Sequence, residues 1–297
     1  MSERVDHRSS ETGLHNSVVP HLDDLSPALR QAADYVLSHP EEIAMRSLRQ
    51  VSLSSDIKAP TYSRLARALG FERYEELREL CRSEIHHRTM TFADRAKALQ
   101  LRSSNVAGAF FLSHAAANVQ NVEKLVASLD LSSLALAADH LAKSERVVLI
   151  GSMSAGSLID FLGYLANMAF DNWRIAGRNH EPTSVPLHDL SAKDTVIVMS
   201  QHPYARSTVE AAASAGEAGA TVIAITDSYT SPLCQSAQFI FVTPTDSPHF
   251  FPSEVATVLL FESLLGMVVR RSGAKARRRI AAVERGIHHS GEYWQEQ

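Results

Sequence analysis

The stretch 195–215, TVIVMSQHPYARSTVEAAASA, constrains the fold more than any other part of the chain. It opens with a short, β-branched apolar run, Val196–Met199, which is typical of a strand buried on both faces. A polar loop with one proline follows, and then an alanine-rich segment with helical character. A strand that leads through a hydroxyl-rich loop into a helix presents backbone N–H groups and the helix dipole at that loop. The stretch therefore predicts either an anion site or an ordinary strand-to-helix turn.

Other strands and helices alternate around this stretch. The alternation predicts an α/β domain with a doubly wound parallel sheet, covered by helices on both faces. Ligands of such sheets bind beyond the carboxyl ends of the strands, so the loops 151–156 and 200–208 are candidates for a site. The first loop has neither the dinucleotide fingerprint nor a Walker sequence. The remaining strands are expected at 146–150, 173–175, 221–225 and 239–242, with helices at 104–143 (two), 158–170 and 252–271, and a basic tail helix after them.

The first third of the chain has only helical patterns. Ser26 and Pro27 suit the start of a helix that runs to Ser38. Two shorter helices follow, at 47–54 and from about Pro60 to Leu69, and Gly70 is placed to end the second in a left-handed conformation. Two short helices joined by a tight turn form a helix-turn-helix arrangement, so we expect an all-α domain here. A further helix is expected at 74–88.

Basic residues gather on these two helices, although the formal net charge of the chain is −4. Between Arg46 and Arg67 the only acidic residue is Asp56. Hydroxyl and guanidinium groups near the start of the second helix can contact phosphates and base edges in a major groove. The alternative is a small helical bundle with a solvated basic face. The residues expected to contact DNA are Arg46, Lys58, Thr61, Tyr62, Ser63, Arg64 and Arg67.

The length and the cysteine content limit the classes of protein to which this chain can belong. A chain of 297 residues predicts about two domains of roughly 100–200 residues each. The two cysteines match no metal or redox spacing, and no segment resembles a signal peptide or a membrane span, so we expect a cytoplasmic protein without metal or cofactor. The expected organisation is a disordered terminus (1–19), a helix-turn-helix domain (20–89), a linker (90–103) and an α/β domain (104–297).

The segment 25–80 resembles the N-terminal domain of the RpiR/MurR family of bacterial transcriptional regulators. Its most specific part is 61–71, TYSRLARALGF, which joins a helix, a glycine stop and the start of the next helix. The chain has Asp56 where the family usually has a glycine, and Lys58 where it usually has a serine cap. An aspartate can still adopt the left-handed conformation of such a turn.

The segment 104–273 resembles the sugar isomerase (SIS) domain, the usual C-terminal half of these regulators. The resemblance lies in 146–151, 194–200, 208–212 and 219–228. Family members that bind phosphosugars have loops of the form G-x-G-x-S and S-x-S-G-x-T. Here Met153 replaces the second glycine, and His202-Pro203 stands where Ser-Gly is expected. Proline has no N–H to donate, so the phosphate cradle is altered, and Arg206 and His202 could supply charge instead.

The resemblance implies a DNA-binding transcriptional regulator, and not an enzyme, that forms a homodimer or homotetramer on a double-stranded operator without involving a membrane. Its SIS-like domain would bind a small-molecule effector, a phosphorylated sugar or another acidic carbohydrate derivative. The alternatives are an isomerase-like enzyme, with Glu254 or Glu262 as base, and a ligand-independent dimer with a degenerate pocket. The residues expected at the effector site are Gly151, Ser152, Ser154, Ser200, Gln201, His202, Arg206, Ser207, Thr208 and Ser253.

Overall fold

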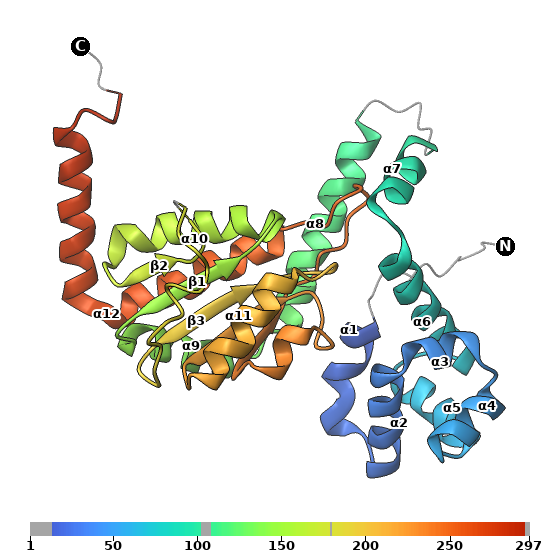
Figure 1. The fold of residues 1–297 in the computed structure, drawn as a ribbon. Coiled ribbons are helices and arrows are strands. Elements are labelled where there is room, and N and C mark those ends of the chain that lie inside the picture. Colours follow the sequence, from blue (N-terminus) through green and yellow to red (C-terminus); the bar gives the residue numbers. More distant parts are fainter. Residues whose placement is uncertain (1–13, 102–107, 179, 295–297) are drawn as a thin grey trace. The chain divides into compact units, whose positions relative to one another are not determined.

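The computed structural model describes residues 14–101, 108–178 and 180–294. The chain falls into two compact units (Figure 1). Unit 1 contains Met1–Asn105 together with His249–Phe251, and unit 2 contains Val106–Pro248 together with Pro252–Gln297. We describe each unit by itself.

The described part of unit 1 is helical. Leu14 and Val18 lie in its core, so residues 14–18, which were expected to belong to a disordered terminus, form a helix instead. Residues 1–13 of that terminus lie outside the described residues. The expected linker is also helical over most of its length. In chain order the elements are α1 (Leu14–Val18), the 3-10 helix η1 (Val19–Asp24), α2 (Pro27–Ser38), α3 (Pro40–Met45), α4 (Leu48–Ser55), α5 (Ala59–Ala68), α6 (Tyr74–Thr89) and α7 (Phe92–Leu101).

Helices α4 and α5 form the predicted helix-turn-helix. Ser47 caps α4, and its side chain and that of Gln50 form a reciprocal capping box. The turn between the helices contains Asp56 at φ 57°, the left-handed conformation that its side chain tolerates. Lys58 occupies the N-cap position of α5 without a side-chain capping bond. Gly70, at φ 89°, follows the end of α5 as predicted.

Unit 2 contains a five-stranded, fully parallel sheet, which confirms the predicted α/β fold. The strand order is β2-β1-β3-β4-β5, so the strand of the opening stretch, β3, lies in the middle. The strands are β1 (Val147–Gly151), β2 (Trp173–Ile175), β3 (Thr195–Met199), β4 (Thr221–Thr226) and β5 (Phe239–Val242). The helices are α8 (Ala109–Ser128), α9 (Leu131–Lys143), α10 (Ser154–Ala169), α11 (Arg206–Glu217), the 3-10 helix η2 (Pro232–Gln235) and α12 (Val255–His289).

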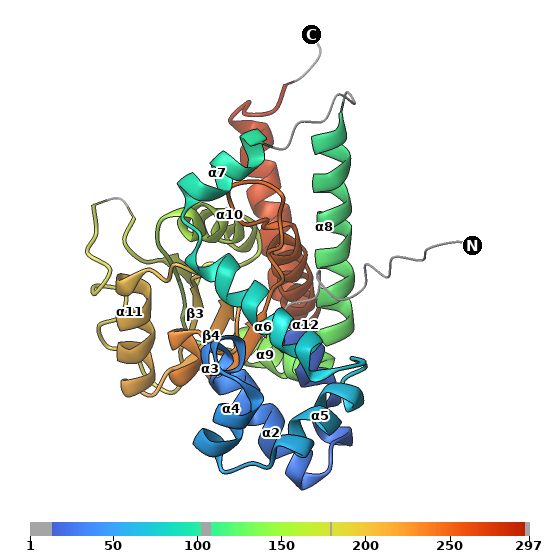
Figure 2. The same cartoon turned by 90° about the vertical axis from the view of Figure 1, so that its right-hand side faces the viewer.

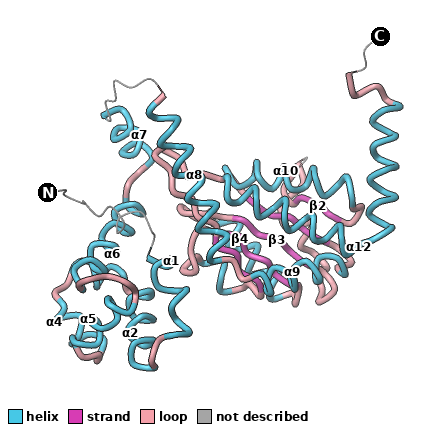
Figure 3. Tube along the Cα trace, turned by 180° about the vertical axis from the view of Figure 1, so that it is seen from behind, coloured by secondary structure: helices cyan, strands magenta, loops and turns pink. Residues whose placement is uncertain are grey.

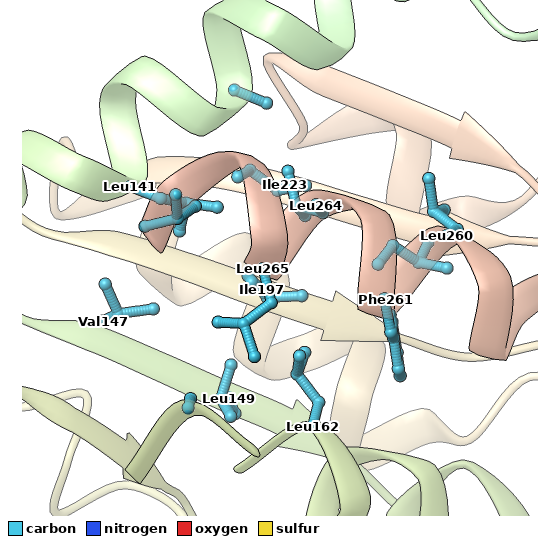
Figure 4. Packing of buried hydrophobic residues seen from close by; sticks show 14 of the residues in the cluster. Leu141, Val147, Leu149, Leu162, Ile197, Ile223, Leu260, Phe261, Leu264 and Leu265 are labelled. Carbon is cyan, nitrogen blue, oxygen red and sulfur yellow. The ribbon is translucent and has the colours of Figure 1, made fainter. Parts of the chain in front are cut away.

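The three central strands β1, β3 and β4 are buried on both faces. Successive side chains of a strand point to opposite faces, and the core follows this period of two. Leu149, Ile197 and Ile223 belong to the cluster that packs against α9, α10 and α12 (Figures 3 and 4). Val196 and Val222 belong to the cluster on the other face, which α11 covers.

Two helices of unit 2 have unusual features. Helix α12 is interrupted at Gly273 (φ 56°, ψ −131°), and its second segment points away from the sheet (Figure 1). Helix α8 is 20 residues long and packs along α12 (Figure 2). No single helix among the described segments is long and apolar enough to cross a membrane, although the bent pair α8 and α9 together meets that requirement by length and composition.

Candidate functional site

The candidate ligand site lies at the carboxyl ends of β1, β3 and β4. These strands are adjacent in the sheet, and Gly151, Ser200 and Asp227 stand at or directly after their ends. Gly151 is required by packing, because a Cβ there would lie 2.7 Å from the Ile159 side chain and 3.0 Å from the Ala155 carbonyl oxygen. The glycine therefore allows the first turns of α10 to pack directly against the end of β1.

Three hydroxyl groups form a cluster between the first two loops. We call Ser152, Ser207 and Thr208 the hydroxyl cluster. The Oγ atoms of Ser152 and Ser207 are 3.0 Å apart, and the Oγ1 of Thr208 donates to the Oγ of Ser152 over 3.2 Å. Ser207 and Thr208 belong to the first turn of α11, where helix N–H groups and the dipole favour an anion. Thr208 is buried and donates to Ser152, so the hydroxyls of Ser152 and Ser207, together with N–H groups of the first turn, are the groups that can donate to an acidic group.

The loop after β3 uses its own donors internally. The backbone N–H of Ala205 donates to the Oγ of buried Ser200 (2.9 Å), and the N–H of His202 donates to Asp227 Oδ2 (3.3 Å). Pro203 has no N–H. The Ser200 hydroxyl, which was expected at the effector site, is buried and accepts a hydrogen bond within the loop.

Gln201 joins this loop to the start of α12. Its Nε2 donates to Glu254 Oε2 over 2.9 Å. The pKa of Glu254 is raised to about 7. Burial is the main cause and the Asp227 carboxylate adds to it, whereas hydrogen bonds with the Gln201 and Thr257 side chains act in the opposite direction. Glu254 was weighed only as a catalytic base and was not among the predicted effector residues. The sequence signal that could have placed Glu254 at the site is its position directly before α12, the helix that follows the last strand.

Other predicted effector residues have different surroundings. Arg206 is exposed and forms an ion pair with Glu210 one turn along α11 (2.7 Å). Ser253 is buried, and its hydroxyl donates to the side-chain oxygen of Asn118 on α8. Ser154 is exposed at the first position of α10. Among the described residues, no group of three or more His, Cys, Asp or Glu side chains could hold a metal ion.

The candidate DNA-binding surface is the exposed face of α5. Arg64 and Arg67 are exposed on it, Ser63 is half-buried, and Lys58 is exposed just before the helix. The prediction for Tyr62 is wrong: its side chain is 0% exposed and packs in the core of unit 1 among aromatic rings.

Two more of the predicted DNA contacts are engaged inside the unit. Thr61 is also buried, and its Oγ1 accepts a hydrogen bond from Arg64 (3.4 Å). Arg46 is held by Glu42 and Ser54, each at 2.9 Å. The exposed basic groups among the predicted DNA contacts are those of Arg46, Lys58, Arg64 and Arg67.

Comparison with known proteins identifies the two halves. The SIS domain family matches residues 140–267. The HTH-type transcriptional regulator HexR of Escherichia coli is 24% identical over 282 residues, which cover 91% of this chain and 92% of that protein. The sugar isomerase domain of the RpiR transcription factor from Sphaerobacter thermophilus superimposes with a TM-score of 0.55 at 22% identity, covering 59% of this chain and 97% of that domain. The chain therefore contains a SIS domain, and over most of its length it is similar to HTH-type transcriptional regulators.

A second solved structure extends the likeness to nearly the whole chain. The Vibrio vulnificus NanR protein, solved in complex with ManNAc-6P, has a TM-score of 0.55 at 17% identity, and the match covers 93% of this chain and 98% of that chain. At these identities the structural likeness shows the fold alone. It confirms the predicted combination of an all-α helix-turn-helix part with a SIS α/β domain.

The loop after β1 contains a strained residue. Met153 adopts φ 56° and ψ −129°, a conformation in which a side chain is unfavourable, and it is 82% exposed. It occupies the position where the sequence comparison expected a glycine. The strain follows from that replacement, because only glycine visits this backbone region readily.

Proposed function

We propose that this protein is a transcriptional regulator that binds an operator through α5 and senses a small acidic ligand, a phosphorylated sugar or a related carbohydrate derivative, in its SIS domain. The observation that carries the proposal is the hydroxyl cluster, which lies at adjacent strand ends in a chain that also contains a helix-turn-helix. The named relatives are HTH-type transcriptional regulators, and NanR was solved with a sugar phosphate, which supports this class of ligand.

The exposed face of α5 supplies the DNA contacts. Pro60, Ser63, Arg64 and Arg67 follow a spacing of three and four residues, which places them on one side of the helix. Tyr62, Leu65 and Ala66 occupy the opposite, buried side. Arg64 and Arg67 would contact phosphates or guanine edges, and Lys58 would contact a phosphate.

A second copy of the chain would cover the exposed face of α8. Leu112, Val119 and Val126 are 64%, 57% and 67% exposed and recur every seven residues, as on a helix that packs against another. Glu123 and Lys124 are the only charged residues of α8. A face that is apolar and poor in charge is typical of an interface between identical subunits. A dimer would place two copies of α5 on the two halves of a roughly palindromic operator.

Ligand binding would change operator affinity by biasing the arrangement of the two DNA-binding heads. Couplings of this kind are worth about 1–3 kcal/mol. A protein with this task would act in the cytoplasm, where the operator and the metabolite are both present.

The test is fluorescence anisotropy on DNA from upstream of the protein's own gene and its neighbours, across a salt series, with and without phosphorylated sugars. We expect sequence-selective binding with a steep salt dependence that at least one of these ligands alters. Binding that is weak and equal for every sequence would contradict the proposal for α5. A regulator that binds DNA and responds to no acidic ligand would instead be the ligand-independent dimer.

A sugar-phosphate isomerase is the second candidate, and one observation favours it. A carboxylate with a pKa near 7 at a SIS strand end has the property of a general base. The named relatives are regulators, and the attached helix-turn-helix serves no isomerase step, so we place this candidate second. Interconversion of an aldose phosphate and a ketose phosphate by the purified protein, lost in Glu254→Gln, would establish it.

A further inference from the structure

The loop between β5 and α12 contributes residues to both units. We call residues 245–253 the bridging loop and His249–Phe251 its tip. The tip belongs to unit 1, whereas the chain before and after it belongs to unit 2. The chain therefore leaves unit 2 after Pro248 and returns to it at Pro252. A proline fixes its own φ angle and restricts the residue before it, so the two prolines stiffen the chain on both sides of the tip.

The base of the bridging loop is anchored in unit 2. The backbone N–H of Ser253 donates to the Thr245 carbonyl oxygen (3.0 Å), which closes the loop at its base. Helix α8 holds the outgoing half of the loop. The Asn121 side chain donates to the Asp246 carbonyl oxygen, and the Lys124 ammonium donates to the Asp246 carboxylate, both over 2.8 Å. The outgoing half is therefore fixed to a helix that does not belong to the candidate ligand site.

The returning half of the bridging loop ends at the ligand loop 200–208. Glu254 directly follows Ser253 and accepts the hydrogen bond from Gln201 (2.9 Å). At its other end, the ligand loop leads into Ser207 of the hydroxyl cluster. A hydrogen bond within the ligand loop closes it between these two ends (2.9 Å). A displacement at the hydroxyl cluster can therefore reach Glu254 through groups that are hydrogen-bonded to one another.

The tip packs on an aromatic ring of unit 1. Phe251 stacks on Phe92, the first residue of α7, with the ring centroids 4.7 Å apart. Within the tip, the N–H of Phe251 donates to Nδ1 of His249 (3.2 Å). The chain reaches Phe92 directly from α6, and α6 packs against α5, the helix proposed to bind DNA. Each of these contacts lies within one unit, and the chain itself joins the two units on both sides of the tip.

We propose that the bridging loop couples the ligand site to the DNA-binding unit, with Phe251 as the positioning residue. This inference rests on the proposed function, because a ligand at the hydroxyl cluster supplies the displacement. When the ligand loop closes on a ligand, Gln201 and Glu254 move together, and the stiff returning half carries the motion to Phe251 and Phe92. The outgoing half stays fixed to α8, so the tip shifts relative to its own base. Ligand and operator then bias the same segment, which is what coupling between two sites requires.

The test is hydrogen exchange of the full-length protein, followed by mass spectrometry on peptides that contain α7. Gln201→Ala removes the bond to Glu254, and we expect it to raise the exchange rate of α7 amides by about fivefold or more, the lower end of ordinary coupling between sites. In a Phe251→Ala background the same substitution should leave α7 unchanged. Gln235→Ala, at an exposed position of η2, is the matched control and should not affect α7 in either background.

A second measurement uses inorganic phosphate as the probe of the hydroxyl cluster. Phosphate should slow exchange in the peptide that contains Ser207, and in the unmodified protein it should also change exchange in α7. In Phe251→Ala the protection at Ser207 should remain and the response of α7 should disappear. Phe251→Leu keeps an apolar contact without the ring and replaces the alanine variant if thermal unfolding shows that the latter is unstable.

The outcomes separate this inference from the proposed function. Phosphate protection at Ser207 with no response of α7, or an α7 response that persists in Phe251→Ala, overturns the coupling role and leaves the ligand site in place. If phosphate protects no peptide, the ligand site of the proposed function fails, and the Gln201→Ala measurement alone decides whether the bridging loop transmits a change. An α7 that does not respond to Gln201→Ala then overturns the inference as well.

Discussion

The Oγ atoms of Ser152 and Ser207 lie 3.0 Å apart, although 55 positions separate the two residues in the chain. The sheet brings them together, because β1 and β3 are neighbours in register, with Gly151 opposite Met199. Ser152 directly follows β1, whereas Ser207 lies in the first turn of α11, beyond the loop that follows β3. The contact closes two loops against each other and creates a group of donors that neither loop has alone.

Replacing Ser207 with alanine should weaken the binding of a phosphorylated ligand by about tenfold, because one hydrogen bond to a charged group is lost. Calorimetric titration with inorganic phosphate or glucose 6-phosphate measures this. Ser214→Ala is the matched control, because Ser214 lies two turns further along α11 and its hydroxyl donates to the Glu210 carbonyl oxygen. Unchanged affinity in Ser207→Ala would show that the hydroxyl cluster does not hold the acidic group.

Tyr62→Ala should lower the free energy of unfolding by about 3–5 kcal/mol, because it removes a fully buried aromatic ring from unit 1. Tyr62→Phe keeps the ring and should leave operator affinity unchanged. Denaturant unfolding and anisotropy on the same samples measure both quantities. If a stably folded Tyr62→Phe protein loses DNA binding, the Tyr62 hydroxyl contacts DNA after all, despite its burial.

Arg64→Ala should weaken operator binding by about 1–3 kcal/mol and make the salt dependence shallower, with little change in stability, because the side chain is exposed. Arg73→Ala, an exposed arginine in the turn before α6, is the control and should bind as the unmodified protein does. Equal losses in the two variants would indicate a general electrostatic effect and contradict a specific role for α5.

Val119→Asp should convert the proposed dimer into a monomer, because it places a carboxylate at the centre of the apolar face of α8. Light scattering coupled to size-exclusion chromatography reads the mass directly. Ser214→Asp introduces the same charge at an exposed position of α11 and should leave the mass unchanged. A dimer that survives Val119→Asp would place the subunit interface on another surface.

Glu254→Gln should make stability less dependent on pH. The pKa of Glu254 is raised in the folded state from 4.5 to about 7. The free energy of unfolding is therefore highest below about pH 4.5, falls as the pH rises through 7, and levels off once Glu254 is ionised in both states. The loss amounts to roughly 3 kcal/mol at most. Urea unfolding at pH 5 and pH 8 should show this decline in the unmodified protein and a smaller decline in the variant. Parallel declines would mean that Glu254 ionises normally in the folded protein.

Local patterns in the sequence were sufficient to predict most of the elements. The strands of unit 2 are short β-branched runs, and the helix-turn-helix follows from Ser47, Gly70 and the spacing of apolar residues between them. The burial of Tyr62 follows from the same spacing, since it shares a face with Leu65 and Ala66. The polar neighbours of Tyr62 at the start of α5 made it resemble a surface residue in the sequence.

Contacts between residues far apart in the sequence could not be predicted from such local patterns. Helix α7 has a weak apolar pattern and no buried residues, so its sequence resembled a linker. The bond between Gln201 and Glu254 joins residues 53 positions apart, and the raised pKa of Glu254 depends on burial that only the assembled domain provides. The internal use of the Ser200 hydroxyl likewise depends on the path of its loop.

The strand order β2-β1-β3-β4-β5 also bears on how this protein is made. The helix-turn-helix packs against α2 and α6 in a core whose residues lie between Leu14 and Ile85, so it can form early during synthesis. The candidate ligand site needs β1, β3, β4 and the start of α12, so it cannot exist until more than 250 residues have been translated. A nascent chain on the ribosome would thus acquire the helices proposed to bind DNA well before it could acquire the site proposed to bind a metabolite.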